Sequence, residues 1–253
     1  MTPKHRPLPA PERPQDPTPL ELAIYNYEVA CAKYHNGKTA MLSQQASKEE
    51  RQKLYAAQEK DWQHLQRRKA ALATHAQLQG ELETYRTENR LKDPFELQDE
   101  PHHPTQRLTR HLYAIGEVKP SPKHAAHHII MGKGRYRAGQ MARARLNLHL
   151  FGVGINDPIN GVWLANNRKG SEQWRVTESS TEKPRHWATP ESPVHLSMHG
   201  ANYETWITVN LGQPNMQERS FMVRLQDIKR QLRFGGYPKM IEEPQDPNWK
   251  GDQ

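Results

Sequence analysis

Two clusters of histidines are the residues of this sequence best suited to chemistry. Residues 124–128 read His-Ala-Ala-His-His, and a second pair, His195 and His199, follows later in the chain. A spacing of four residues places both imidazoles of the later pair on one face of a helical turn, about 5–6 Å apart at Cβ. Three imidazoles around one divalent ion leave positions open for water and substrate, which is typical of a catalytic metal site. The two clusters therefore predict a hydrolytic metalloenzyme.

The adjacent residues His127 and His128 suit two different tasks, metal binding and proton transfer. Hydrolysis of a phosphodiester needs an activated water, a base, and positive charge near the phosphate. A neutral imidazole accepts a proton near physiological pH, so we predict that His128 is the base. The predicted metal ligands are His127, His195 and His199. Because neighbouring side chains of a regular strand point to opposite faces, we expect a turn or bulge at His127.

Further polar residues are candidates for the same site. We group Asn160 with His128 as catalytic and expect its side-chain amide to hold the loop of the base by hydrogen bonds. His124 fits equally a hydrogen bond behind the metal ligands, a phosphate contact or a plain loop position. Basic side chains that could contact backbone phosphates are Lys133, Arg135, Arg143, Arg145 and Arg168. His149 is predicted to be a surface or packing residue, and His186 to be solvated.

The charge of the chain favours an anionic partner. The formal net charge is +8, which indicates nucleic acid, or alternatively a basic surface that only maintains solubility. The excess accompanies the histidine clusters: residues 120–253 hold 18 Lys and Arg against 12 Asp and Glu, a balance of +6. The remaining 18 and 16 leave +2 for residues 1–119.

Other functional classes are disfavoured by composition. The single cysteine, Cys31, excludes an intrachain disulfide and a four-cysteine zinc module. No run approaches the roughly 18 apolar residues that span a membrane. The sequence also begins without the apolar segment of a secretory signal. We expect a protein made in the cytoplasm without a cleavable signal peptide.

The first 92 residues predict a leader followed by a helical hairpin. Residues 1–17 are rich in proline and should be extended or disordered. Capping boxes at residues 18–21 and 47–50 predict two helix starts. The first helix should end near Asn36-Gly37, and the second should reach about Arg90, with a break at Gly80. No heptad repeat persists, so a hairpin over residues 18–92 is favoured over a long coiled coil, with a docking or delivery role.

Residues 93–119 predict a linker, and residues 120–253 predict the catalytic domain. The linker is rich in proline, and its pair His102-His103 is expected in a solvated loop rather than as ligands. In the domain, the pattern predicts a strand at Ile129-Ile130, a helix over 138–151, a strand over 159–164, a helix directly after His199 and a last helix that ends at Gly235-Gly236.

The order and spacing of these features resemble the AHH nucleases of the HNH/endonuclease VII superfamily. The resemblance covers roughly residues 120–235 and rests on four segments: Ala126-His127-His128, the helix from Ala142 to Gly154, residues 156–164, and His195-x-x-x-His199 with Tyr203. It implies an α+β, mostly helical fold around a small ββα-metal (His-Me) finger with one divalent ion. By the same resemblance His128 is the general base and the other three histidines are ligands, while Asn160 matches the central Asn-Gly position.

The sequence departs from that family's pattern at two places. Leu164 is followed by Ala165-Asn166-Asn167, where the family has Leu-Pro. Ser197 stands at the middle of the His-x-x-x-His segment, where the family has glycine. Neither change removes a predicted ligand.

The resemblance implies a bacterial polymorphic toxin, and we expect a metal-dependent DNA endonuclease that is secreted into the cytoplasm of a target cell. Its expected partners are DNA, a cognate immunity protein, and a secretion apparatus or adaptor, such as type VI, that binds the N-terminal region. The expected ion is Zn²⁺ or Mg²⁺, with Ni²⁺ as a further option; three imidazoles favour Zn²⁺ or Ni²⁺. The alternatives are a ribonuclease with the same site, a non-catalytic zinc protein that binds nucleic acid, and an interaction protein that acts through its N-terminal helices.

Overall fold

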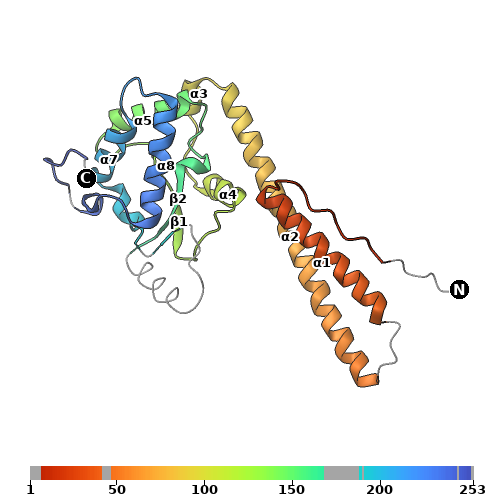
Figure 1. Cartoon of the computed structure of the whole chain (residues 1–253). Coiled ribbons are helices and arrows are strands. Elements are labelled where there is room, and N and C mark those ends of the chain that lie inside the picture. The colour runs from red at the N-terminus through yellow and green to blue at the C-terminus, as the bar shows by residue number, and fades with distance from the viewer. Residues whose placement is uncertain (1–6, 42–46, 168–187, 190, 244, 252–253) are drawn as a thin grey trace. The chain divides into compact units, whose positions relative to one another are not determined.

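The computed structural model describes residues 7–41, 47–167, 188–189, 191–243 and 245–251. The chain divides into two compact units, residues 1–77 and residues 78–253 (Figure 1). The described residues are mostly helical, and their one sheet has two antiparallel strands. This confirms the α+β fold expected from the sequence.

The first unit contains α1 (Pro19–Met41) and the N-terminal part of α2 (Lys48–Leu91). Both predicted capping boxes are present. Thr18 accepts a hydrogen bond from the backbone of Glu21, whose carboxylate accepts one from the backbone of Thr18. Ser47 and Glu50 form the same reciprocal pair. Tyr34 of α1 stacks on Trp62 of α2 at 5.7 Å between ring centroids, so the two helices pack as a hairpin.

Two helix ends were predicted wrongly. α1 passes through Asn36-Gly37 and ends at Met41. The Asn36 side chain binds the backbone N–H and C=O of Leu8. α2 likewise runs through Gly80 without a break. A glycine inside a helix costs about 1 kcal/mol, which neighbouring turns can absorb.

The second unit builds the remaining elements around the sheet. In chain order they are α3 (Pro94–Gln98), α4 (Gln106–Ala114), β1 (His124–His128), α5 (Ala138–Leu150), η1 (Pro158–Asn160), β2 (Gly161–Ala165), η2 (His195–His199), α7 (Ala201–Leu211), α8 (Glu218–Phe234) and η3 (Lys239–Glu242). Strand β1 pairs with β2 from His124 opposite Ala165 to His128 opposite Gly161. Gly161 permits close packing of α4, because a Cβ there would lie 2.6 Å from a methyl of Leu108.

Residues 93–119, predicted as a linker, contain packed secondary structure. Asp93 caps α3 and Pro94 occupies its first turn. Leu97 of α3 and Leu108 and Leu112 of α4 are buried. The apolar spacing of these leucines explains the packing, although proline dominates the composition of the segment. Where one functional domain ends and the next begins stays a prediction.

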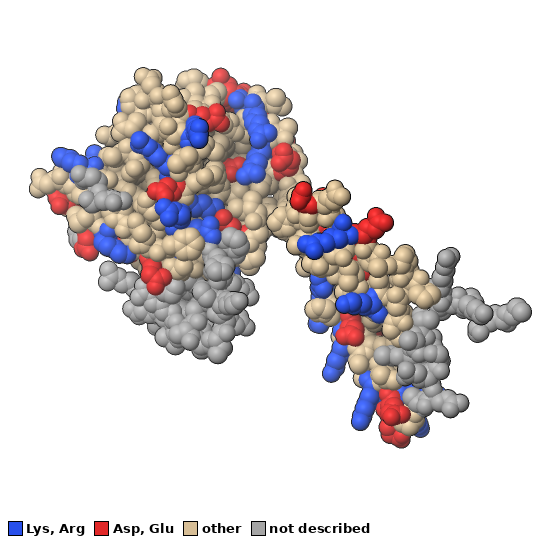
Figure 2. Space-filling view, viewed as in Figure 1, with Lys and Arg blue, Asp and Glu red and all other residues tan. Residues whose placement is uncertain are grey.

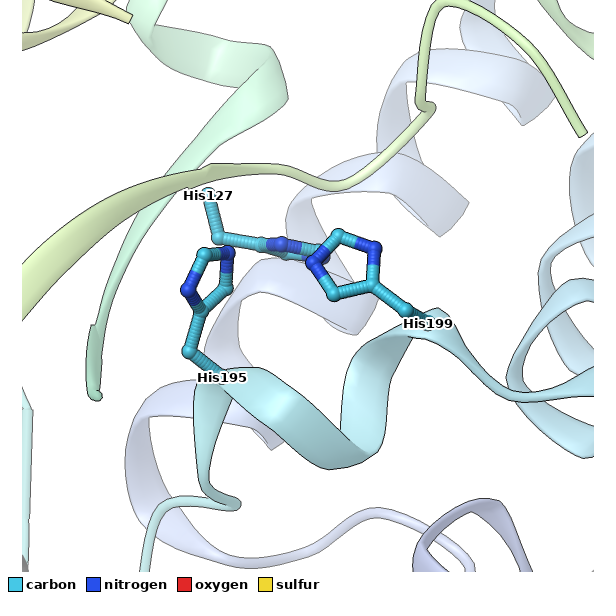
Figure 3. A group of neighbouring side chains, drawn as sticks. All are labelled: His127, His195 and His199. Carbon is cyan, nitrogen blue, oxygen red and sulfur yellow. The ribbon is translucent and has the colours of Figure 1, made fainter. Parts of the chain in front are cut away.

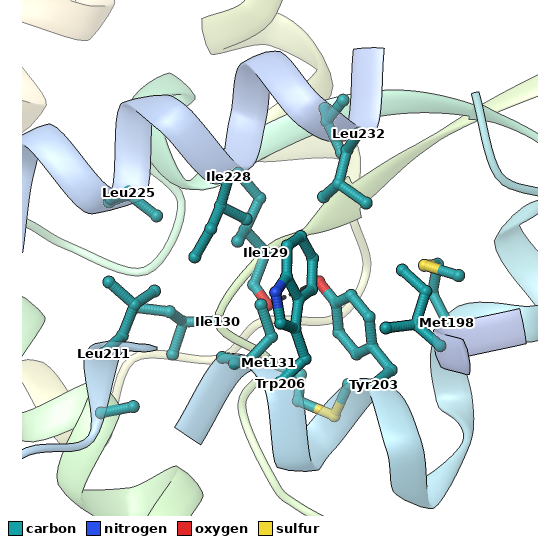
Figure 4. Packing of buried hydrophobic residues seen from close by; sticks show 14 of the residues in the cluster. Ile129, Ile130, Met131, Met198, Tyr203, Trp206, Leu211, Leu225, Ile228 and Leu232 are labelled. Carbon is teal, nitrogen blue, oxygen red and sulfur yellow. Dashed lines mark hydrogen bonds between the residues drawn. The ribbon is translucent and has the colours of Figure 1, made fainter. Parts of the chain in front are cut away.

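The main core joins the segment after β1 to α7 and α8 (Figure 4). Ile129 and Ile130 are fully buried, as are Tyr203 of α7 and Leu225 of α8. Each such side chain contributes about 1.5–3 kcal/mol. The predicted strand is displaced by this packing: β1 ends at His128, and the chain bends at Ile129 and Ile130. The three helices predicted after this region are confirmed, including the end of α8 at Gly235, which has a positive φ.

The surface carries both signs of charge. Figure 2 shows Lys and Arg interspersed with Asp and Glu over the visible face. Among the described residues, no helix combines the length and the apolar character that a membrane crossing requires.

Candidate metal centre and active site

Three imidazoles converge from two elements of the second unit (Figure 3). His127 comes from β1, and His195 and His199 come from η2. One nitrogen of each ring lies within 4.8 Å of the others, and the ring centroids are 5.0–5.7 Å apart. These residues form the histidine triad. The i, i+4 pair thus lies side by side as predicted, on a 3₁₀ turn in which Ser197 replaces the family's glycine without a positive φ.

The chemistry of the triad fits a divalent transition metal. Burial lowers the pKa of His127 well below its usual value, and the nearby His195 and His199 lower it further. Burial also lowers the pKa of His195, to about 4, and that of His199. All three rings are therefore neutral at physiological pH. A metal needs such unprotonated nitrogens, and imidazole suits zinc, nickel and copper.

Tyr203 of α7 orients the His127 ring. Its hydroxyl lies 3.2 Å from Nε2 of His127 and donates its hydrogen to the carbonyl of Ile129 at 2.8 Å. Since a hydroxyl has only one hydrogen, it must accept the N–H of Nε2. The lone pair of the His127 ring is then on Nδ1. A hydrogen bond of this kind behind a ligand fixes the ring and raises its basicity.

His128, the predicted base, is the last residue of β1 and lines the same pocket as the triad. The pocket has a volume of about 250 Å³. The Nε2 atom of His128 lies 3.0 Å from Oδ1 of Asn156. Burial lowers the pKa of His128 to about 4, so the ring is neutral at physiological pH, although the hydrogen bond to Asn156 opposes this shift. The predicted turn or bulge at His127 is absent: β1 is regular from His124 to His128, the chain bends directly after it, and both rings line the pocket.

Two histidines of the predicted linker also line this pocket, contrary to the sequence-based expectation. His102 is half-buried, and its ring centroid lies 6.2 Å from that of His128. His103 is exposed at the same pocket. A His-His pair between prolines is the signal that could have indicated them, but solvated linkers have the same composition. Lys133, which the sequence predicts as a phosphate contact, lines the pocket as well.

Asn160 holds the bend that follows the base, in the manner predicted for it. Its Oδ1 accepts the N–H of Ile130, and its Nδ2 donates to the carbonyls of Ile130 and Ile155. The residue is fully buried. Its amide is therefore occupied by backbone groups, and Asn160 positions the loop rather than touching a substrate.

Several other candidates lie away from the pocket-lining residues. His124 is buried at the start of β1, where its Nδ1 is 2.8 Å from the Ser121 hydroxyl. Arg135 and Arg143 are exposed outside the pocket. None of these three residues is among the described residues that line the pocket of the triad and His128.

The structure tests two of the remaining predictions, a phosphate contact at Arg145 and a packing role for His149, and the first is wrong. Arg145 is buried and donates to the carbonyls of Gly132 and Glu100, so its guanidinium holds loops together and is not free for phosphate. His149 is buried, and its Nε2 accepts a hydrogen bond from Arg145, which confirms a packing role. Arg168 and His186 lie outside the described residues.

Comparison with known proteins agrees with this geometry. Residues 108–232 match the model of the AHH family, described as a nuclease family of the HNH/ENDO VII superfamily with conserved AHH. The conserved triplet corresponds to Ala126, His127 and His128. HNH superfamily nucleases use a divalent metal, which the triad suits. No curated protein and no solved structure matches the chain. The chain therefore carries a nuclease domain of the AHH family, within the HNH/ENDO VII superfamily.

Proposed function

We propose that this protein is a metal-dependent endonuclease that hydrolyses the phosphodiester bonds of DNA. The observation that carries the proposal is the shared pocket of the histidine triad and His128. A structural zinc site closes its coordination with a fourth protein ligand. The described residues offer three imidazoles here, which favours an open, catalytic site over a zinc-containing binding module.

The side chains around the pocket divide the chemistry between them. The triad would hold a divalent ion, which supplies positive charge to the phosphate and to the leaving oxygen when it is bound. His128 accepts a proton from the attacking water as the new P–O bond forms. The Lys133 ammonium neutralises a phosphate oxygen at the pocket. The leaving oxygen takes a proton from solvent as its bond to phosphorus breaks.

The proposal includes a role as an antibacterial toxin. The protein would be made in a bacterial cytoplasm, secreted into the cytoplasm of a target cell and blocked in the producer by a cognate immunity protein. The N-terminal helices would bind the secretion apparatus or an adaptor. Tyr55 and Trp62 on α2 are 61% and 41% exposed, and exposed aromatic side chains are typical of protein interfaces, which supports this docking role.

A parallel cleavage assay tests the enzymatic part. The full chain is incubated with plasmid DNA and with RNA, each with Zn²⁺, Ni²⁺ or Mg²⁺ and with excess chelator. We expect metal-dependent nicking of DNA. Cleavage of RNA alone would show that the substrate is RNA and not DNA, with the same active site. Full activity in excess chelator would contradict the requirement for a metal ion. Expression in the cytoplasm of a susceptible bacterium tests the toxin role: we expect growth arrest that active-site substitutions relieve.

A further inference from the structure

Asn156 lies against the base, and the hydrogen bonds of its side chain are fully determined. Its Nδ2 donates to Oε1 of Glu100 at 2.8 Å and to the carbonyl of Pro101 at 3.1 Å. Both partners can only accept hydrogen bonds, since neither a carboxylate nor a carbonyl carries a hydrogen. The amide therefore cannot be reversed, and Oδ1 is the atom that faces Nε2 of His128 at 3.0 Å.

The backbone of Asn156 is held just as firmly. Its N–H donates to the Tyr85 hydroxyl at 3.1 Å, and its carbonyl lies 2.7 Å from Nδ1 of His111. All three residues are buried. The position of Oδ1 is therefore set before any substrate arrives.

This geometry determines the tautomer of the neutral His128 ring. An amide oxygen can only accept, so Nε2 of His128 must carry the hydrogen. The lone pair is then on Nδ1, so Nδ1 is the ring nitrogen available to accept a proton. The opposite tautomer would place two lone pairs against each other across 3.0 Å.

Glu100 fixes the amide from a position before the family match, which begins at residue 108. Its side chain is 9% exposed. While Oε1 accepts from Asn156, Oε2 accepts from the Tyr85 hydroxyl at 2.9 Å and from the backbone N–H of Ile155 at 3.2 Å. The carboxylate is thus held by donors on several segments. The segment between α3 and α4 completes the surroundings of the base.

We propose that Asn156 and Glu100 are positioning residues that hold His128 in the tautomer with its hydrogen on Nε2 and its lone pair on Nδ1. The inference rests on the proposed role of His128 as base. It adds two residues, one of them outside the matched segment, that determine which nitrogen does the chemistry. Neither residue needs to touch the substrate, so their loss should lower kcat and leave KM nearly unchanged.

NMR spectroscopy measures the tautomer of the His128 ring directly. Long-range proton–nitrogen NMR spectra of the full chain, recorded at about pH 8 where histidine is neutral, distinguish a protonated ring nitrogen from one with a lone pair. The His128 signals are identified by their absence in His128→Gln. We expect a protonated Nε2 in the wild type and a mixture of tautomers in Asn156→Leu. The same variant should lose about tenfold or more in kcat, with KM within about twofold.

A paired exchange separates positioning from simple destabilisation. Asn156→Asp sets two carboxylates against each other and should lower kcat. Adding Glu100→Gln removes the repulsion between the two carboxylates and supplies a donor to the new one, so it should restore part of the activity; the carbonyl of Pro101 still faces the carboxylate in both variants. Chemical-shift dispersion in the same spectra shows that each variant is folded. If the folded double variant has no higher kcat than Asn156→Asp, the result would contradict the proposed pairing of Asn156 with Glu100.

The two readouts keep this inference distinct from the proposed function. A wild-type spectrum with the hydrogen on Nδ1, or no change of tautomer in folded Asn156→Leu, would overturn the inference even if the protein cleaves DNA. A wild type that shows the expected tautomer and cleaves neither DNA nor RNA would overturn the base role on which the inference rests.

Discussion

His127 and His128 are consecutive residues of one regular strand, line one pocket, and have different hydrogen-bond partners behind their rings. Nε2 of His127 lies 3.2 Å from the hydroxyl of Tyr203, and Nε2 of His128 lies 3.0 Å from Oδ1 of Asn156. Only the first ring belongs to the triad. The different partners explain how two adjacent imidazoles can perform separate tasks.

Loss of one ring of the triad should abolish tight metal binding. His195→Ala leaves two imidazoles, and we expect its affinity for Zn²⁺ to fall by more than about 100-fold, since outer partners alone are worth 10–100-fold. Isothermal titration of the chelator-treated protein measures this. His64→Ala removes an exposed histidine of α2 and should bind as the wild type does. Equal affinity of the two variants would exclude His195 as a ligand.

The Tyr203 hydroxyl should matter for metal affinity through its hydrogen bond to His127, although Tyr203 is not itself a predicted ligand. Tyr203→Phe leaves Nε2 of His127 and the carbonyl of Ile129 without this partner, and we expect a loss of about 10–100-fold in Zn²⁺ affinity. Unfolding free energy should fall by about 1–3 kcal/mol. Tyr136→Phe, at a side chain that is 49% exposed, is the matched control. An unchanged affinity in Tyr203→Phe would show that this hydrogen bond does not tune the ligand.

Lys133 should contact a phosphate of the substrate. Lys133→Gln should raise KM and reduce the slope of log K against log salt concentration by about 1. Binding measured at several salt concentrations with the metal-free protein gives that slope. Arg143→Gln changes an exposed charge outside the pocket, so its effect on KM and on the slope should be smaller. A slope unaffected by Lys133→Gln would remove the lysine from the interface.

Acid should destabilise the second unit through its buried histidines. Burial lowers the pKa of His149 and of His124 to about 4 from 6.5. The unfolded chain therefore binds more protons between these values, so the free energy of unfolding falls as the pH falls, by on the order of 3 kcal/mol per residue. Urea unfolding from about pH 7 to about pH 4 measures the loss. His149→Gln should flatten the dependence by up to one proton, and an unchanged slope would contradict this.

Much of the fold and most of the site could be predicted from short sequence patterns. Capping boxes located the starts of α1 and α2, because a cap is a contact between residues three apart. The i, i+4 spacing of His195 and His199 similarly determined that the two rings lie together. The role of Asn160 followed from the geometry of a strand and an adjacent loop, and its hydrogen bonds agree with it.

The rest depends on contacts between residues far apart in the chain. Asn156 meets Glu100 and His128 through folding, and no local pattern marks any pair of these residues. His102, in the segment between α3 and α4, lines the pocket. The leucines of these two helices are buried within the second unit, and a proline-rich composition conceals this packing. The hydrogen bonds between Asn36 and Leu8 likewise join residues 28 positions apart, and sequence alone does not reveal them.

The central claim is that His128 is the base and is not a metal ligand. Metal binding and cleavage, measured separately in variants of His128 and of the triad, test this claim most directly. Metal content and plasmid cleavage are measured on the same preparations of the wild type, His128→Ala and His195→Ala. We predict that His128→Ala keeps one ion per chain and loses about 10²–10⁴-fold in cleavage rate, while His195→Ala loses both. Full cleavage by metal-loaded His128→Ala would contradict the account.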